Sequence, residues 1–72
     1  MLQSSVEEAL RSAAAQVDEM LQRQDDLRSV LYVLDAGMKY GDENDACLTA
    51  EARAYKTRLH TIRSICMYRL IS

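Results

Sequence analysis

The feature that most constrains this chain is a run of residues spaced alternately four and three positions apart. This spacing puts every member on one stripe of an α-helix, and a run of such length predicts a coiled-coil-like helix. The run consists of Val6, Leu10, Ala13, Val17, Met20, Gln24, Leu27, Leu31, Leu34 and Met38. All of its members except Gln24 are apolar. Ser5 followed by Glu8 forms a capping box, so we expect the helix to begin at Ser5.

A second run with the same spacing lies in the last third of the chain. It consists of Leu48, Ala52, Tyr55, Leu59, Ile62 and Cys66. Between the two runs stand Gly37, which suits the residue after a helix, and Gly41, which is the other candidate stop. Asn44 or Asp45 suits the N-cap of the next helix.

The predicted fold is all-α, an antiparallel helical hairpin of coiled-coil type that occupies residues 1–72 as a single domain. We expect one helix over about 5–37, a loop over about 38–44 and a second helix over about 45–70. The residues expected to fill the seam between the two helices are Leu10, Val17, Met20, Leu27, Leu31, Leu34, Leu48, Tyr55, Leu59, Ile62 and Cys66. Because residues 22–26 are all polar, the alternative is a break there, with Asp25 or Asp26 capping a third helix.

The composition agrees with a helical protein that has little core of its own. The chain has no proline and only two glycines, far less turn punctuation than a sandwich or barrel of short strands needs. Its apolar share of 49% is ordinary for a globular protein. At 72 residues, however, the apolar surface that folding buries barely offsets the ordering of the chain, which favours a partner chain.

The charge is unevenly distributed. Residues 1–50 carry four basic and ten acidic side chains, whereas residues 51–72 carry five basic side chains and one acidic one. The two parts would attract each other if the chain folds back on itself, although solvated helix faces explain the same pattern equally well. The overall net charge of −2 argues against nucleic-acid binding. No apolar stretch is long enough to span a membrane and no signal-peptide pattern is seen, so a cytoplasmic location is expected.

The sequence holds few residues that could carry chemistry. His60 is the only histidine, and no histidine or carboxylate stands three or four positions from it to complete a metal site. Neither Cys47 nor Cys66 has a local base, so both are interpreted as small apolar fillers. No glycine-rich phosphate loop is present. We therefore expect no catalytic residue, no cofactor and no metal site.

Apolar residues outside the seam predict a surface for another protein. The last turns of the chain, residues 65–71, contain six apolar residues in seven positions, more than one seam can bury. The residues expected to bind the partner are Met67, Tyr68 and Ile71, with Val30 and Val33 as a second candidate strip. The alternative is that these residues pack inside the molecule against a third element.

Several segments resemble the YscE/PscE-like co-chaperones of the type III secretion needle subunit. They are Gly41-Asp42, Glu51-Ala52-Arg53-Ala54-Tyr55 and Leu59-His60-Thr61-Ile62-Arg63-Ser64-Ile65, within about residues 24–66. The resemblance implies a cytoplasmic bacterial protein that pairs with a tetratricopeptide-like chaperone. Together the two keep the needle subunit monomeric before export, as a heterotrimer. Needle subunits resemble one another in a proline-bearing turn, and this chain has no proline.

A different hypothesis is a self-assembling structural protein, either a needle-like subunit or a homodimeric four-helix bundle. Two hairpins that bury their seams against each other would satisfy the same spacing. A homo-oligomer of the free chain is also compatible with the co-chaperone hypothesis.

Overall fold

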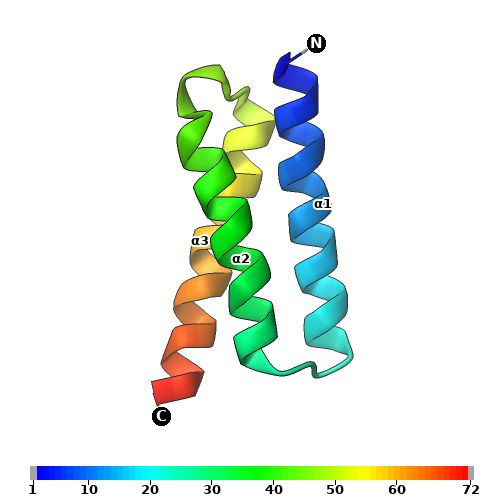
Figure 1. Cartoon of the computed structure of the whole chain (residues 1–72), viewed down its shortest axis with the longest axis vertical. Coiled ribbons are helices and arrows are strands. Elements are labelled where there is room, and N and C mark those ends of the chain that lie inside the picture. Colours follow the sequence, from blue (N-terminus) through cyan, green and yellow to red (C-terminus); the bar gives the residue numbers. More distant parts are fainter. Residues whose placement is uncertain (1, 72) are drawn as a thin grey trace.

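The computed structural model describes the backbone of residues 2–71 and the side chains of residues 5–71. It contains helices α1 (Leu2–Gln22), α2 (Leu27–Glu43) and α3 (Ala50–Ile71), and a short 3-10 helix, η1 (Asp45–Cys47), between α2 and α3. Helices α1 and α3 run in one direction and α2 in the other (Figure 1). Each α-helix contacts the other two, so the fold is an all-α three-helix bundle measuring 40 × 20 × 16 Å.

The predicted two-helix hairpin is therefore wrong, because the helix expected over about 5–37 is interrupted after Gln22. The amide of Asp25 donates to the carbonyl oxygen of Met20 at 2.9 Å, and that of Gln24 to Leu21 at 3.1 Å. Gln24 has a φ of 60°, so this ending has the Schellman pattern with Gln24 in the left-handed region.

The alternative break within residues 22–26 is the arrangement that the structure has. The carboxylate of Asp26 accepts a hydrogen bond from the amide of Arg28 at 3.0 Å and caps α2. Residues 22–26 have no apolar side chain whose burial would stabilise a continuous helix. Their hydrogen bonds instead end α1 on one side and begin α2 on the other.

The predicted helix start at Ser5 is also wrong, because α1 begins at Leu2 and Ser5 lies inside its first turns. Glu8, the acidic residue of the expected capping box, has another partner. Glu7 and Glu8 both pair with Arg11, one turn further along α1. Glu7 also accepts a hydrogen bond from the hydroxyl of Thr49 at 3.0 Å, which ties α1 to the start of α3.

Neither glycine ends a helix, since α2 continues through both of them to Glu43. Both serve close packing instead. A Cβ at Gly37 would lie 3.0 Å from Leu59 Cδ1 and 3.2 Å from Ala13 Cβ. A Cβ at Gly41 would lie 3.3 Å from the Lys56 side chain and 3.4 Å from that of Leu10. The loop expected over about 38–44 is therefore mostly helix.

The connection to α3 comes later than predicted. Asn44 ends α2 and Asp45 begins η1, so neither caps the third helix. Thr49 does so: its hydroxyl oxygen accepts from the amide of Ala52 at 3.1 Å, and its carbonyl oxygen from Arg53 at 2.9 Å.

All three helices contribute to one apolar core. Its buried residues are Val6, Leu10, Ala14, Val17, Met20, Val30, Leu34, Ala52, Leu59 and Cys66. Leu27, Leu31, Leu48, Tyr55 and Ile62 are half-buried against it. Every residue expected in the seam thus lies in this core or packs against it, but between three helices rather than two. No charged or polar side chain is buried in the described part of the chain.

Candidate interaction surfaces

The residues expected to bind a partner do not form one surface. Tyr68 is 75% exposed and Ile71 is 81% exposed, whereas Met67 is half-buried beside them on α3. Val33 is half-buried between α1 and α2, away from the end of α3. Val30 has no exposed surface, which corrects its expected place on an outward strip. The reason is the break after Gln22, which turns Val30 into the three-helix core.

The first surface is the α3 end patch, which we define as Ile65, Tyr68, Leu70 and Ile71. Leu70 is 44% exposed and Ile65 is 49% exposed, so all four large apolar side chains reach solvent. Tyr68 lies on the outer side of α3, about 160° around the helix from the buried Cys66, and Ile65 stands three residues before Tyr68 on the neighbouring turn. The patch covers the end of α3 furthest from η1 (Figure 1).

The second surface is a groove between α1 and α2, on the side that α3 does not cover. We define this α1/α2 groove by the lining residues Ala9, Leu10, Ser12, Ala13, Gln16, Tyr32, Val33, Ala36, Gly37 and Tyr40. It encloses about 430 Å³ and continues past Gln16 and Val33 into a second hollow that Met20, Arg28 and Ser29 help to line. Tyr32 is 79% exposed and stands at the junction of the two hollows.

Sequence reasoning missed this groove, because a hairpin has no α1/α2 boundary. None of the ten side chains that line its first hollow is charged. Five of them are alanine, serine or glycine, which let two helix backbones approach closely. The signal in the sequence is the coincidence of uncharged small residues on α1, such as Ala9 and Ser12, with Ala36 and Gly37 on α2. That coincidence has meaning only once the two helices are known to pair.

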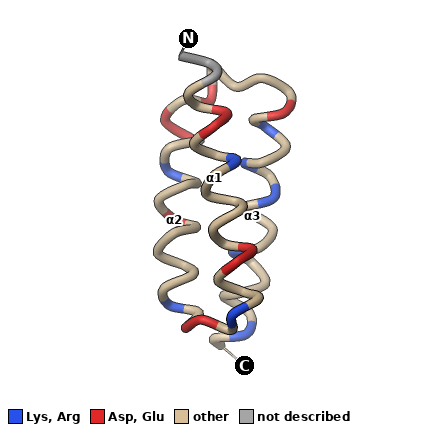
Figure 2. Tube along the Cα trace, turned by 90° about the vertical axis from the view of Figure 1, so that its right-hand side faces the viewer, with Lys and Arg blue, Asp and Glu red and all other residues tan. Residues whose placement is uncertain are grey.

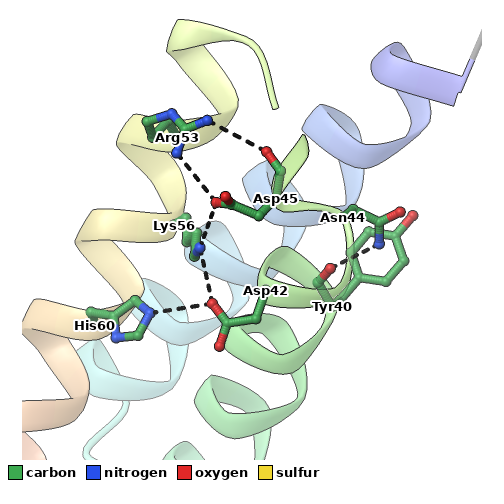
Figure 3. Close-up of polar contacts among 7 residues, drawn as sticks. All are labelled: Tyr40, Asp42, Asn44, Asp45, Arg53, Lys56 and His60. Carbon is green, nitrogen blue, oxygen red and sulfur yellow. Dashed lines mark hydrogen bonds and ion pairs between the residues drawn. The ribbon is translucent and has the colours of Figure 1, made fainter. Parts of the chain in front are cut away.

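A cluster of charged side chains joins the turn after α2 to α3. Lys56 Nζ lies 2.9 Å from an oxygen of Asp42 and 2.9 Å from an oxygen of Asp45, and so stands between the two carboxylates (Figure 3). Arg53 adds a contact to Asp45 at 3.2 Å. His60 Nε2 lies 3.9 Å from the same oxygen of Asp42 that Lys56 contacts. The cluster holds η1 and the end of α2 against α3.

These contacts shift the pKa values of two groups in the cluster. The hydrogen bond from Lys56, together with the positive charges of Lys56 and Arg53, lowers the pKa of the Asp45 carboxyl. Hydrogen bonds to Asp45 and Asp42 raise the pKa of the Lys56 ammonium. Both shifts favour the charged forms, so at neutral pH the contacts of Lys56 with Asp42 and Asp45 act as an ionic clasp.

Further ion pairs follow α3 along both of its neighbours. Arg58 pairs with Asp18 of α1 at 2.6 Å, and Arg63 with Asp35 of α2 at 2.7 Å. Figure 2 shows the basic positions of α3 and the acidic positions of the other helices along the trace. The oppositely charged parts of the sequence therefore meet in the folded chain.

The remaining reactive side chains are not brought together. Cys47 is exposed in η1 and Cys66 is buried in the core, and both are free thiols. Within residues 2–71, no three His, Cys, Asp or Glu side chains are grouped as a metal ion would require. No helix in the described range is long and apolar enough to cross a membrane.

Comparisons of this chain with protein-family models, with curated proteins and with solved structures give no match.

Proposed function

We propose that this protein is a non-enzymatic binding module that covers an apolar surface of another protein with its α3 end patch. The observation that carries the proposal is the exposure of four large apolar side chains within the last described turns of α3. Tyr68 and Ile71 expose three quarters or more of their surface. Large apolar side chains that are exposed together at one end of a helix favour an interaction site there.

The contrast with the rest of the molecule supports this proposal. Besides the patch, the only large hydrophobic side chains exposed in the described chain are Tyr32 and Tyr40, both beside the α1/α2 groove. The core also supports it: it is built mainly from small and medium side chains, and the three helices bury no phenylalanine or tryptophan because the chain has none. A partner that buries the patch would add the apolar contact that so small a bundle lacks.

The specific form of the proposal follows from the sequence resemblance. A co-chaperone of the type III secretion needle subunit would act in the bacterial cytoplasm, paired with a tetratricopeptide-like chaperone. The needle subunit would be the third member of the complex and would stay monomeric until export. The physical task needs no catalysis: surfaces that polymerise must be covered beforehand, and an apolar patch on a stable small bundle suits one part of that cover.

The experiment is co-expression with the products of the neighbouring genes, followed by affinity capture and measurement of Kd for the recovered partner. The variant Tyr68→Ser with Ile71→Ser should weaken binding at least about tenfold, equivalent to roughly 1.4 kcal/mol, because interface tyrosines often dominate binding energy. The matched control is Tyr32→Ser, which removes an equally exposed tyrosine from another face. It should leave the affinity unchanged.

Circular dichroism of the free variants separates binding from folding. We expect both variants to keep the helical content and melting temperature of the parent, because the substituted side chains are exposed. The proposal fails if the double variant melts much lower than the parent, since the patch would then be part of the folded core. It also fails if the Tyr32 variant loses as much affinity as the double variant.

A further inference from the structure

We propose that α1 and α2 can join into one continuous helix, and that two copies of the chain then exchange α1 to form a domain-swapped dimer. The feature that carries this inference is the turn over residues 23–26, between the two helices. Each half of the dimer is the same three-helix bundle, built from α1 of one copy and from α2 and α3 of the other. The inference does not use the α3 end patch and is independent of the proposed function.

The turn contains one strained residue and no buried one. Gln24 has a φ of 60°, in the left-handed region that glycine adopts readily and that other residues adopt at a cost. None of residues 22–26 is buried. The contact of the Arg23 side chain with Asp25 is exposed as well. No buried side chain therefore holds the bend, and a continuous helix would relieve the conformation of Gln24.

The core-facing side of α1 continues into that of α2 when residues are counted straight through the turn. Residues spaced by seven lie on one side of a helix. One such series has buried or half-buried members on both sides of the turn: Val6, Ala13, Met20, Leu27, Leu34 and Gly41. In a continuous helix these residues form a single core-facing stripe.

The two faces beside this stripe are in phase as well. Three residues that line the α1/α2 groove are separated by multiples of seven: Ala9, Gln16 and Gly37. So are three of the acidic residues that contact α3 or its N-cap: Glu7, Asp35 and Asp42. A turn can join two helices in any relative phase, so a bundle that folds only as a monomer does not need this match. With it, a continuous helix presents each face to the same neighbours as in the single chain.

The third helix does not block the exchange. Leu59 approaches Gly37, and α3 runs antiparallel to α2 (Figure 1). Ile71 follows Leu59 by twelve residues and Asp25 precedes Gly37 by twelve, so the end of α3 is level with the turn. Straightening carries α1 away from α2 and α3 of its own chain. The α3 helices of the two copies then end near the two-fold axis instead of running past each other.

The continuous helix also has costs, which favour the single chain at low concentration. Asp26 no longer caps α2, and two aspartates enter a helix interior, where their propensity is low. The apolar contacts between the three helices are kept, because each α1 takes the same place on the other copy. Detaching α1 exposes the core, so we expect the exchange to occur during refolding at high concentration.

The first test changes the preference of position 24. Gln24→Gly suits the left-handed conformation and disfavours a continuous helix, whereas Gln24→Ala does the reverse. Their association constants should differ by about a hundredfold or more, because each dimer has two straightened turns and each turn changes the constant about tenfold. Gln24→Asn, which keeps the amide but tolerates the left-handed region, should dimerise less than the parent. Each chain is refolded from urea at about 5 to 500 μM and analysed by sedimentation velocity.

The second test measures how far apart α1 and α2 of one chain lie inside the dimer. Glu8 and Glu43 are exposed, near the outer ends of α1 and α2. Spin labels on Glu8→Cys with Glu43→Cys lie within about 25 Å in the single chain, because packed helices are close neighbours. Along a continuous helix the same thirty-five residues span about 52 Å.

The labels are placed in the Gln24→Ala chain. Cys47→Ser removes the exposed native thiol, and Cys66 is buried. Assembly with a large excess of unlabelled chain ensures that pulsed electron paramagnetic resonance measures the distance within one chain.

A Gln24→Ala dimer with labels about 50 Å apart, together with a monomeric Gln24→Gly, supports the inference. A Gln24→Ala chain that stays monomeric at about 500 μM overturns it. So does equal dimerisation of the alanine and glycine variants. A dimer whose labels stay within about 25 Å also overturns it, since two intact bundles would then lie side by side. Circular dichroism checks that each variant is folded, and the order of the position-24 variants decides the question without the labels.

Discussion

Helix α3 is held to its neighbours differently from the way α1 and α2 are held to each other. Along α3, side chains such as Arg58 and Arg63 reach across to Asp18 of α1 and Asp35 of α2. Along the α1/α2 boundary no ion pair joins the two helices among the described residues, and the groove is lined by small neutral side chains. The same bundle thus has ionic boundaries around one helix and a neutral boundary between the other two.

The difference shows that the contacts that align the helices of this bundle are not the ones that supply most of its stability. Exposed ion pairs contribute little energy each, but they favour one alignment of α3 against oppositely charged neighbours. Small side chains let α1 and α2 approach closely and leave a shallow, uncharged surface between them. Most of the stability then has to come from the apolar core that all three helices share.

The strongest test of this division is a charge in the shared core. Leu59→Asp places a carboxylate at a position of α3 with no exposed surface, where no basic side chain is buried beside it. The cost should be about 4 kcal/mol or more, comparable to the whole stability of a domain of this size, which is roughly 4–10 kcal/mol. Circular dichroism should show loss of cooperative melting.

The matched control removes ionic contacts of α3 and leaves the core intact. Arg58→Ser with Arg63→Ser should cost only about 1 kcal/mol in total, because both pairs are exposed. If the arginine variant loses as much stability as Leu59→Asp, the conclusion that the core supplies most of the stability is wrong. The ionic boundaries of α3 would then carry the fold. Leu31→Asp should fall between the two, since Leu31 is only half-buried.

The two glycines of α2, Gly37 and Gly41, test how closely the helices must approach at the boundary between α1 and α2. At Gly37 a side chain meets Leu59 and Ala13 within 3.2 Å, so Gly37→Val should cost about 2 kcal/mol through overpacking. At Gly41 a Cβ meets mainly the flexible stem of Lys56, at 3.3 Å or more. Gly41→Ala should therefore gain about 0.5 kcal/mol from helix propensity.

Urea unfolding of both glycine variants gives the free energy of unfolding of each, for comparison with the parent. Opposite signs would show that close approach of α1, α2 and α3 is needed at Gly37 but not at Gly41. If Gly37→Val is as stable as the parent, the small residues of the groove do not set the distance between the helices.

The 4–3 spacing of the sequence selected residues that lie in or against the core, but it could not count the helices. Gln24 keeps the spacing in step, so the run reads as one helix through the position where the chain turns. In the structure the backbone of Gln24 is left-handed and no helix passes through it. A local pattern records which side chains are apolar. It does not show whether tertiary contacts favour one continuous helix or two helices joined by a turn.

The glycines and the groove show a second limit. Glycine suits both a helix end and a close helix contact, and only the position of Leu59 against Gly37 decides between them. Likewise Ala9, Ser12 and Ala36 carry no signal in isolation, since alanine and serine are common on solvated helices. The exposed end of α3 was easier to anticipate, because six apolar residues in seven positions exceed what one helix stripe can bury.

The smallest expected effect is on the pH dependence of stability. It should differ between the paired cations of α3 and the unpaired cations of α2. Lys56 lowers the pKa of Asp45 from its ordinary value of 3.8, so the pair stabilises the fold above that value. This contribution is lost as the pH falls through the lowered pKa of the folded state. The pKa of Lys56 is raised above 10.5, so its contribution is complete below that value and is lost as the pH rises through the raised pKa.

Lys56→Gln should therefore lower the melting temperature by a few degrees between about pH 5 and pH 9, and should flatten its decline on both the acidic and the alkaline side. Lys39→Gln is the matched control: it removes a cation without an internal partner, and should leave the melting curve unchanged in dilute solution. About 1 M salt should bring Lys56→Gln closer to the parent, because the contacts of Lys56 are with exposed carboxylates. If the two lysine variants lower the melting temperature equally at neutral pH, the ionic clasp around Lys56 contributes no more than an unpaired surface charge, and the contrast between the two regions does not extend to stability.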